Sequence, residues 1–546
     1  MRITNSMISN ASALHIANAK DYLMTRQNQY STGKKIMRPS EDPIVAIRSL
    51  QLRTTYNKLQ QYVDKNIKDA LSWMESTERI MNNIVGPSGI TTSMKEKLDE
   101  GTKDSLGQSQ RHAVLEEVQE YVKAIFQENA NSDFAGRYLM TGYRTDTSLL
   151  FPEDTGVDAE GKGNLQYEIK EHLSASNIRS IAYVNSELKY IDGNTAAQYV
   201  DLGSSMAQTQ VYRMQLAYDN CSNASLEIAD SLQSPEDEKF ALKGGDAISI
   251  QLTVDGEPLN DDGDGNDQSI QTVTTMKSTD LNTKGEVNGQ SLEDFMKADD
   301  PQAIYLYDTG EVIMNSAAYN LIQENGAQID VTYTKTEFEE GDIRPEMYFE
   351  CSSYNGISDK VTYYRDPSNQ NIQYEINFTQ TAVVNVQAKD ALSTDIYRTI
   401  DYLAQTIYAV DDVERRLSEV DNLIENAAED DPNMEAYTQL KELLETEQKL
   451  RTKTMNDAFG MSLTMVDKAE DMLNSAMANL GTRYKRVELT RDKLEDDLVN
   501  TEEKLSDNED VDIADAYINL TQADTLYQAA LSATAKILGN SLLNYI

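Results

Sequence analysis

The residues best suited to chemistry are few in this chain, and none stands in a recognised catalytic motif. The three histidines, His15, His112 and His172, lie far apart, which leaves little for acid–base or zinc chemistry. The two cysteines, Cys221 and Cys351, are too few for a disulfide framework. Motifs of the G-x-G-x-x-G, H-E-x-x-H, C-x-x-C and G-x-S-x-G types are also missing from the sequence. The sequence therefore predicts no catalytic site and no enzyme.

Two loops resemble ligand-binding motifs but lack a required residue. The segment 156–163 approaches a phosphate-binding loop, yet Gly163 stands where a Ser or Thr must bind magnesium. The acidic segment 261–267 resembles a calcium loop. Counted from Asp262, its sixth position is Asp267 instead of glycine, and its twelfth is Val273, which offers no side-chain ligand. Both segments are interpreted as solvated loops, so we expect no metal and no cofactor.

Composition narrows the possible partners. The 546 residues include 49 basic and 91 acidic side chains, a net charge of −42. Such a field repels nucleic-acid phosphates and anionic lipid, so neither nucleic acid nor a membrane is expected as a partner. No apolar run is long enough to span a bilayer, and the first residues lack the apolar core of a signal peptide. We expect no cleaved signal.

The hydrophobic pattern divides the chain into three parts. Residues from about 3 to 127 and from about 391 to 546 show a helical period, whereas the region between them has short alternating runs rich in Gly, Asp, Asn and Thr. The predicted fold is mainly α with an inserted β-rich region, a long-helix or coiled-coil bundle built from both chain ends. The predicted domains are residues 1–45 with 505–546, residues 46–150 with 390–504, and an insertion at 151–389.

The insertion contains recognisable strand signals. Four short runs with apolar alternation or Gly-containing breaks are expected to be strands: 247–254, 304–306, 312–314 and 329–333. A helical interlude is expected from about 196 to 232. Because it would separate the first strands from the rest, the sequence allows two interpretations of the insertion, as one domain or as two subdomains.

Heptad spacing predicts a bundle seam, meaning the apolar stripe along which the central helices pack. Strides of three and four residues connect apolar positions over several heptads, which is typical of knobs-into-holes packing. The seam residues are Leu52, Tyr56, Leu59, Val63 and Trp73 before the insertion, and Leu480, Tyr484, Val487, Leu494 and Leu498 after it.

Both chain ends carry further apolar stripes. The stripes allow two interpretations. The terminal helices either belong to a self-contained bundle or await partners, because an end helix without a close neighbour is marginal alone. The second reading makes these residues an assembly interface: Met7, Leu14, Ile513, Tyr517, Leu520, Tyr527, Leu531 and Leu538.

The turn after the first helix follows from local chemistry. Ser31, Thr32 and Gly33 form a stop signal, and either Ser40 or Asp42 can cap the next helix ahead of Pro43.

Six segments near the two chain ends form a recognisable set: 29–35, 39–43, 136–145, 512–516, 531–538 and 542–546. Together they resemble the bacterial flagellin superfamily, and within it the flagellin-like proteins of the hook–filament junction. The Asp-Pro-Ile sequence at 42–44 departs from the Asp-Asp-Ala-Ala type usual in filament flagellins. The resemblance covers residues 1–151 and 390–546.

The resemblance implies a structural subunit that joins hook and filament as an adaptor ring. Its implied partners are other copies of itself, a hook-associated protein on the hook side, filament flagellin on the distal side and an export chaperone before secretion. It implies an extracellular flagellar location, reached unfolded through the type III channel, with end helices that pair on assembly. Two alternatives stay open: filament flagellin, and a non-flagellar coiled-coil surface adhesin whose strand domain binds a ligand.

Overall fold

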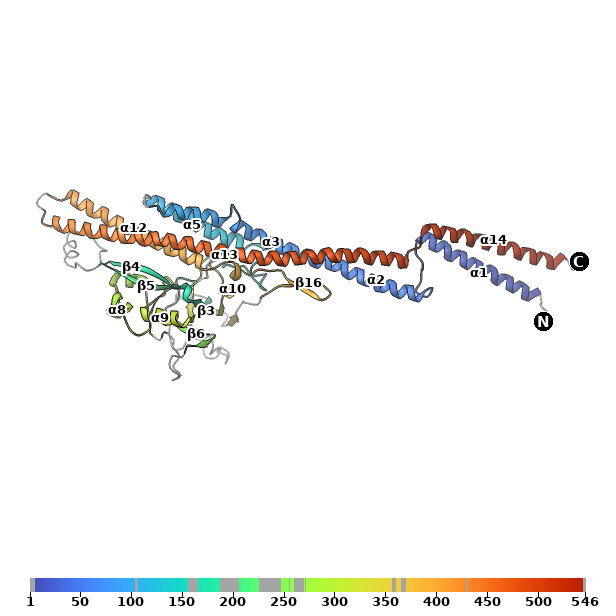
Figure 1. Ribbon diagram of the computed structural model, residues 1–546, viewed down its shortest axis with the longest axis horizontal. Helices are drawn as coiled ribbons and strands as arrows, with labels where there is room; N and C mark the ends of the chain where they lie inside the picture. Colours follow the sequence, from blue (N-terminus) through green and yellow to red (C-terminus); the bar gives the residue numbers. More distant parts are fainter. Residues whose placement is uncertain are drawn as a thin grey trace. The chain divides into compact units, whose positions relative to one another are not determined.

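A computed structural model describes most of the chain, and the elements are shown in Figure 1. The described residues are 5–103, 107–155, 165–186, 206–224, 247–254, 256–259, 270, 272–355, 360–364, 370–428 and 431–543. They fall into two compact units, which are treated separately. Unit 1 comprises residues 1–72, 373–383 and 483–546, and unit 2 comprises residues 73–372 and 384–482. The domain boundaries proposed from the sequence stay a prediction.

Unit 1 is built mainly from long helices. Its elements are α1 (Asn5–Thr32), α2 (Pro43–Gln61), the π-helical turn η1 (Tyr62–Ile67), the start of α3 (Lys68–Val85), the last part of α13 (Met434–Glu509) and α14 (Ile513–Leu543). The predicted stop of the first helix is confirmed, because α1 ends at Thr32 and Gly33 has φ +69°. Asp42 caps α2 by accepting hydrogen bonds from the amides of Ile44 and Val45.

A small hairpin of unit 1 packs on the π-helical turn. Strands β16 (Gln373–Asn377) and β17 (Gln380–Val383) pair antiparallel. The Asn66 side chain donates to the Glu375 carbonyl at 2.9 Å, and the Tyr62 and Phe378 rings meet edge to face with centroids 5.3 Å apart. The hairpin therefore covers the side of the helix at the point where its period changes.

Unit 2 contains a helical layer beside two sheets. Its helices are most of α3, α4 (Ile90–Gly101), α5 (Gln108–Lys123), η2 (Ala124–Ala130), α11 (Ala388–Ala391), α12 (Asp395–Asn426) and the first part of α13. Arg111 of α5 reaches Asp411 and Glu414 of α12 at 3.2 and 2.7 Å. Arg416 of α12 is paired with Glu447 of α13 at 3.0 Å inside a small apolar cluster. These buried ion pairs fix the lateral order of the helices.

The strand-rich part of unit 2 holds a six-stranded and a five-stranded sheet. The first has the order β15-β14-β3-β13-β6-β7 and the second β4-β5-β12-β11-β8. Neighbours pair antiparallel except β11 and β8, which are parallel. Their bounds are β3 (Leu165–Ser174), β4 (Arg179–Ser186), β5 (Met206–Gln215), β6 (Ile248–Val254), β7 (Glu257–Pro258), β8 (Thr272–Met276), β11 (Gln302–Leu306), β12 (Glu311–Met314), β13 (Gln328–Lys335), β14 (Glu350–Asn355) and β15 (Lys360–Tyr364).

Short elements complete unit 2. They are the hairpins β1 (Asp133–Phe134) with β2 (Arg137–Tyr138) and β9 (Glu286–Val287) with β10 (Gln290–Ser291), the 3₁₀ turn η3 (Ala175–Asn177), and the helices α7 (Ser278–Lys284), α8 (Leu292–Met296), α9 (Ser316–Asn325) and α10 (Pro345–Tyr348).

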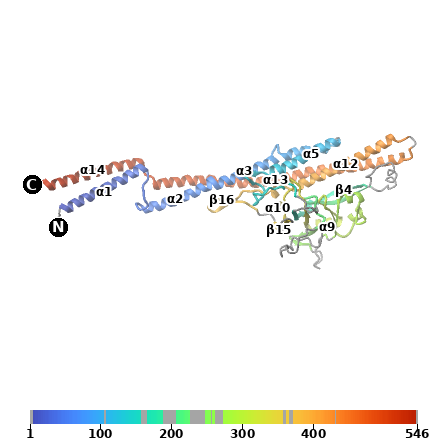
Figure 2. The same cartoon turned by 180° about the vertical axis from the view of Figure 1, so that it is seen from behind.

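The five-stranded sheet is apolar on both faces. Tyr305 of β11 and Val312 of β12 belong to the core shared with the six-stranded sheet. Their neighbours Ile304 and Ile313 belong to a second core, together with α7 and α8 and with Tyr402 of α12 packed against it. Side chains alternate across a strand, so one sheet can supply both cores. Figure 2 shows α13 and the β4 sheet from behind.

The four predicted strands are confirmed as β6, β11, β12 and β13. The helical interlude expected at 196–232 is wrong where it can be compared, because residues 206–215 form strand β5. Long-range pairing decides this segment, since β5 lies between β4 and β12 and buries Val211 and Met214. The two candidate loops, 156–163 and 261–267, lie outside the described residues.

The mainly α architecture with an inserted β-rich region is therefore as the sequence predicts. In the described part of the chain, no helix is both long enough and apolar enough to cross a bilayer.

Candidate functional site

Helices α1 and α14 lie side by side in unit 1 and are joined at one end by a short backbone ladder (Figure 1). The Lys35 amide donates to the Glu509 carbonyl at 2.6 Å, and the Val511 amide donates to the Gly33 carbonyl at 2.8 Å. The left-handed turn at Gly33 makes this ladder possible, since it ends α1 and redirects the chain toward α13. The two end helices are thus tied together at the point where α13 gives way to α14.

Charged side chains reinforce the same junction. Glu509 is almost fully buried and accepts two hydrogen bonds from Arg53 of α2, at 2.7 and 2.6 Å. Lys34 reaches Asp510 at 2.5 Å and Glu509 at 3.4 Å. The Arg53 guanidinium lowers the pKa of Glu509, and the Lys34 ammonium lowers the pKa of Asp510. Both carboxylates therefore stay ionised below the usual pH range, and they hold α2 and the segment that follows α1 against the end of α13.

The mutually covered faces of α1 and α14 follow a heptad of mostly small residues. On α14 the covered positions are spaced four and three apart, and Ala516 and Ala523 are fully or almost fully buried. Small side chains let two helices approach closely but bury little apolar area. The covered positions are Ser12, Ile16, Ala19, Leu23 and Arg26 on α1, and Ala516, Leu520, Ala523, Tyr527, Ala530 and Thr534 on α14.

The assembly residues predicted from the sequence divide between two faces. Leu520 and Tyr527 lie on the covered face of α14. The others with described side chains are exposed, from 41% for Leu531 to 68% for Ile513: Met7, Leu14, Ile513, Tyr517 and Leu531. Tyr517 also contacts the ring of Tyr30 on α1, with centroids 5.9 Å apart. The side chain of Leu538 lies outside the described part of the chain.

The predicted seam residues differ in burial, and none of them is exposed. Leu59, Val487 and Leu494 are buried in unit 1, and Trp73 and Leu480 are buried in unit 2. The remaining seam residues, Leu52, Tyr56, Val63, Tyr484 and Leu498, are half-buried in unit 1. Within unit 1, the Asn508 side chain of α13 donates to the Val45 carbonyl of α2 at 3.1 Å, so the two helices are in contact.

Sequence reasoning missed a second set of exposed apolar residues. Ile44, Ile47 and Leu50 recur every three residues on α2 and are 58–78% exposed. Their three-residue spacing predicts an apolar face on α2, but this face lies opposite the one that carries the predicted seam residues. Further exposed residues of unit 1 lie outside the predicted stripes: Tyr22, Met24, Met37, Phe378, Leu489, Val499, Ile518 and Leu526.

Exposed large apolar side chains are concentrated in one unit. Among the described residues, all of them except Tyr143 and Tyr408 belong to unit 1. A monomeric protein rarely exposes so many apolar side chains on one body, and such surfaces mark contact sites. Unit 1 is therefore the candidate functional surface of this chain.

The residues with chemical potential have structural roles. His112 is paired with Asp411 at 2.5 Å, and His172 with Asp330 at 2.7 Å, which raises the pKa of His172. Cys221 and Cys351 are free buried thiols. Burial raises the pKa of the Cys221 thiol to about 11. In the residues described above, no group of three or more side chains is arranged to hold a metal ion.

Known families match both ends of the chain. Residues 3–145 match the bacterial flagellin N-terminal helical region, and residues 463–546 match the bacterial flagellin C-terminal helical region. Both ends of the chain are therefore similar to the terminal helical regions of bacterial flagellins, and the resemblance predicted from its sequence is confirmed.

Individual relatives are hook-associated proteins. The chain is 25% identical over 217 residues to flagellar hook-associated protein 3 of Escherichia coli K12, covering 39% of this chain and 64% of the relative. It is 26% identical over 172 residues to the protein of that name from Salmonella typhimurium, covering 31% and 52%. The chain thus spans about half to two thirds of the length of these relatives. The crystal structure of hook-associated protein 3 from Legionella pneumophila aligns with 12% identity and a TM-score of 0.30, over 84% of this chain and 98% of that one.

Proposed function

We propose that this chain, whose two ends are similar to flagellin terminal helical regions, is a structural subunit of the bacterial flagellum that joins hook and filament as an adaptor ring. The observation that carries the proposal is the concentration of exposed apolar side chains in unit 1. All of these side chains except Phe378 lie in the two regions that match the flagellin family. The names of the two curated relatives favour the junction over the filament.

The packing of α1 and α14 supports a role of these helices in contacts between subunits. The α1–α14 contact uses small residues such as Ala516 and Ala523, while larger ones such as Met7, Leu14 and Ile513 face outward. Each large apolar side chain contributes ~1.5–3 kcal/mol when it becomes fully buried. Covering the outward face with a neighbouring subunit would therefore contribute more free energy than the contact between α1 and α14 does. Neighbouring subunits would cover it through repeated head-to-tail contacts that close into a ring.

The proposed partners follow from this role. Other copies of the chain would pack around the ring, a hook-associated protein would lie on the hook side and filament flagellin on the distal side. An export chaperone would bind the subunit before its secretion to an extracellular flagellar location. The role is structural and includes no catalytic step.

Immunogold electron microscopy of detached flagella tests the proposal. An antibody against residues 272–355 recognises a described part of unit 2 that is distant in sequence from the flagellin regions. We expect gold particles clustered at the hook–filament boundary. Labelling along the whole filament would instead identify a filament flagellin, and labelling of the cell surface without flagella would identify an adhesin.

A further inference from the structure

An open groove runs along one edge of the five-stranded sheet in unit 2. Strand β4 is the edge strand, because it pairs with β5 on one side and with no other described strand. The groove has a volume of about 850 Å³ and is lined by the consecutive β4 residues 179–182 and by α13 residues between 453 and 468, with Gln208 and Gln210 of β5 and Tyr402 of α12 beside them. Consecutive strand residues point to opposite faces, so a cavity lined by all four β4 residues reaches the strand's edge, and the β5 residues show that it extends from there onto the neighbouring face.

The lining of the groove is cationic in an acidic protein. Arg179, Lys453 and Lys468 line it, and the charges of Arg179 and Lys468 also act on Asp395 of α12. Asp457 also lines the groove, and Asp395 lines an adjoining cavity with Arg179 and Lys468. The three cations outnumber these two carboxylates, in a chain where acidic residues outnumber basic ones by 91 to 49. This charge favours an anionic occupant.

A glycine keeps the groove open on the helix side. Gly460 is exposed near the middle of α13, and a Cβ added there would have no neighbour within 4 Å. Glycine in a helix interior costs about 1 kcal/mol relative to alanine. The α13 segment along the groove, residues 453–468, is about 22 Å long at 1.5 Å per residue, which matches a strand of six to seven residues.

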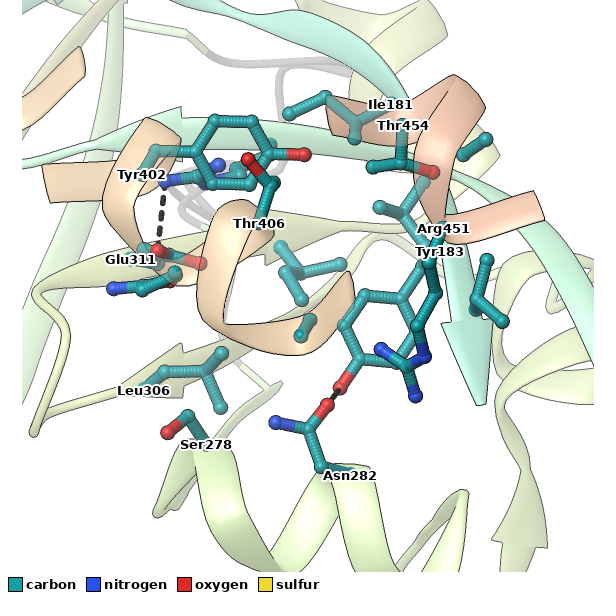
Figure 3. Close-up of a pocket in the computed structure, with 17 residues that line it drawn as sticks. Ile181, Tyr183, Ser278, Asn282, Leu306, Glu311, Tyr402, Thr406, Arg451 and Thr454 are labelled. Carbon is teal, nitrogen blue, oxygen red and sulfur yellow. Dashed lines mark hydrogen bonds and ion pairs between the residues drawn. The ribbon is translucent and has the colours of Figure 1, made fainter. Parts of the chain in front are cut away.

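The groove continues into a smaller apolar cavity of about 130 Å³ beneath it. Figure 3 shows that Ile181 and Tyr183 of β4 face Tyr402 of α12 and Thr454 of α13 across this cavity. Tyr183 is held in place by a hydrogen bond to Asn282 of α7. The cavity is large enough for one apolar side chain of an occupant.

We propose that this groove binds an extended acidic polypeptide segment of a partner protein, which adds a strand to the free edge of β4. Main-chain pairing with β4 supplies affinity, an apolar side chain enters the inner cavity, and the three cations select carboxylates. This binding function is separate from the flagellar assembly surface of unit 1, so either proposal can fail without the other.

A labelled eight-residue peptide that alternates Glu and Val is the direct probe, with binding to the full chain followed by fluorescence polarisation. We expect saturable binding that weakens as salt is added. A peptide alternating Lys and Val should not bind, and neither should the Glu–Val peptide with alternate backbone nitrogens methylated, because it cannot pair with β4.

Two matched glycine substitutions make the test specific. Gly460→Leu fills the groove and is expected to weaken binding at least about tenfold, which corresponds to 1.4 kcal/mol. Gly481→Leu lies in the same helix, also has space for a side chain, and should bind like the wild type. Both substitutions raise helix propensity, so thermal unfolding should confirm that both variants fold.

Charge reversal gives an independent readout. Lys453→Glu combined with Lys468→Glu should weaken binding and reduce its dependence on salt. The proposal is overturned if the Glu–Val peptide does not bind at about 1 mM. It is also overturned if the N-methylated peptide binds equally well, since binding would then not use backbone pairing with β4. Displacement of the peptide from the Gly460→Leu variant by polygalacturonate would likewise overturn it, since it would mean non-specific polyanion binding outside the groove.

Discussion

Arg53 of α2 and Glu509 at the end of α13 form a bidentate ion pair, with the Nε–Oε1 and Nη2–Oε2 atoms 2.7 and 2.6 Å apart. The pair joins residues 456 positions apart in the sequence. It also stands directly beside the backbone ladder that links α1 to the start of α14. The position of the end helices therefore depends on a contact that neither helix makes itself.

Removing Arg53 should loosen this junction. In Arg53→Ala, Glu509 stays almost buried but loses two charge-assisted hydrogen bonds. Because the Arg53 side chain is more than half exposed, the expected loss is only about 1 kcal/mol. Hydrogen–deuterium exchange should show faster exchange in residues 505–515 and in 28–36. Arg48→Ala on the same helix is the matched control, and equal exchange in both variants would contradict the prediction.

The same pair predicts an acid sensitivity. Arg53 and Lys34 lower the folded-state pKa values of Glu509 and Asp510. The stabilisation is therefore complete above the unfolded-state pKa values near 4.5 and 3.8, and it is lost as the pH falls through the lower folded-state values. Exchange at the junction, divided by the intrinsic amide exchange rate at each pH, should accelerate below about pH 4 in the wild type. In Glu509→Gln this acceleration should be smaller, and an unchanged pH profile would show that the pair contributes nothing.

Charge on the outward face of α14 should block assembly without unfolding the subunit. Leu531 is 41% exposed, so Leu531→Asp is expected to change the free energy of unfolding by less than about 0.5 kcal/mol. The aspartate would be buried without a partner once a neighbour covers this face, which opposes incorporation into flagella. Immunoblots of isolated flagella and thermal unfolding of the monomer measure the two effects.

A buried position on the same helix provides the contrast. Ala523 is fully buried against α1, so Ala523→Asp should destabilise the α1–α14 pair even in the free monomer. If Leu531→Asp destabilises the monomer as much as Ala523→Asp does, the outward face is already packed. If Leu531→Asp is incorporated normally, the assembly role of this face is wrong.

Deletion of residues 519–546 should separate folding of unit 2 from assembly. The deleted residues belong to unit 1, and the two sheets and their cores lie in unit 2. We expect the near-ultraviolet circular dichroism of the tyrosine-rich sheets to persist while incorporation into flagella is abolished. Normal incorporation of the truncated chain would contradict the proposed role of the end helix.

Repetition in the sequence explains which parts of the fold could be predicted. Leu59, Val487 and Leu494 recur in heptads, so their inner position follows from periodicity alone. The α1–α14 contact did not follow, because its covered stripe includes Ala516 and Ala523, and reasoning from periodicity gives large apolar residues more weight.

Long-range pairing explains most of the rest. Strand β13 pairs with β3, more than 150 positions earlier, and no local pattern specifies that neighbour. Arg398 of α12 is buried and donates to the Leu216 carbonyl at 3.2 Å, so it fixes the sheet against the helix. A charged residue in a helical period is ordinarily read as exposed, and its burial depends on carbonyls that the fold brings to it.

The buried Glu171 of β3 predicts a second, opposite pH dependence. Its carboxyl accepts hydrogen bonds from the Tyr333 hydroxyl and, at 2.9 Å, from the Ala217 amide. Burial outweighs these bonds and raises the pKa of Glu171 to about 7 from 4.5. Between these values the native state keeps a proton that the unfolded chain has released, so stability falls as the pH rises from about 4.5 to about 7. The full loss is about 3 kcal/mol.

Glu171→Gln should remove this dependence, because the amide is neutral throughout and keeps an acceptor for both donors. Urea unfolding of unit 2 at pH 5 and pH 8 measures it, with Glu257→Gln in the exposed strand β7 as the control. We expect the stability difference between Glu171→Gln and the wild type to shift by about 3 kcal/mol in favour of the variant at pH 8. The same shift in Glu257→Gln would assign the effect to general charge repulsion, and no shift in either variant would mean that Glu171 is ionised in the native protein.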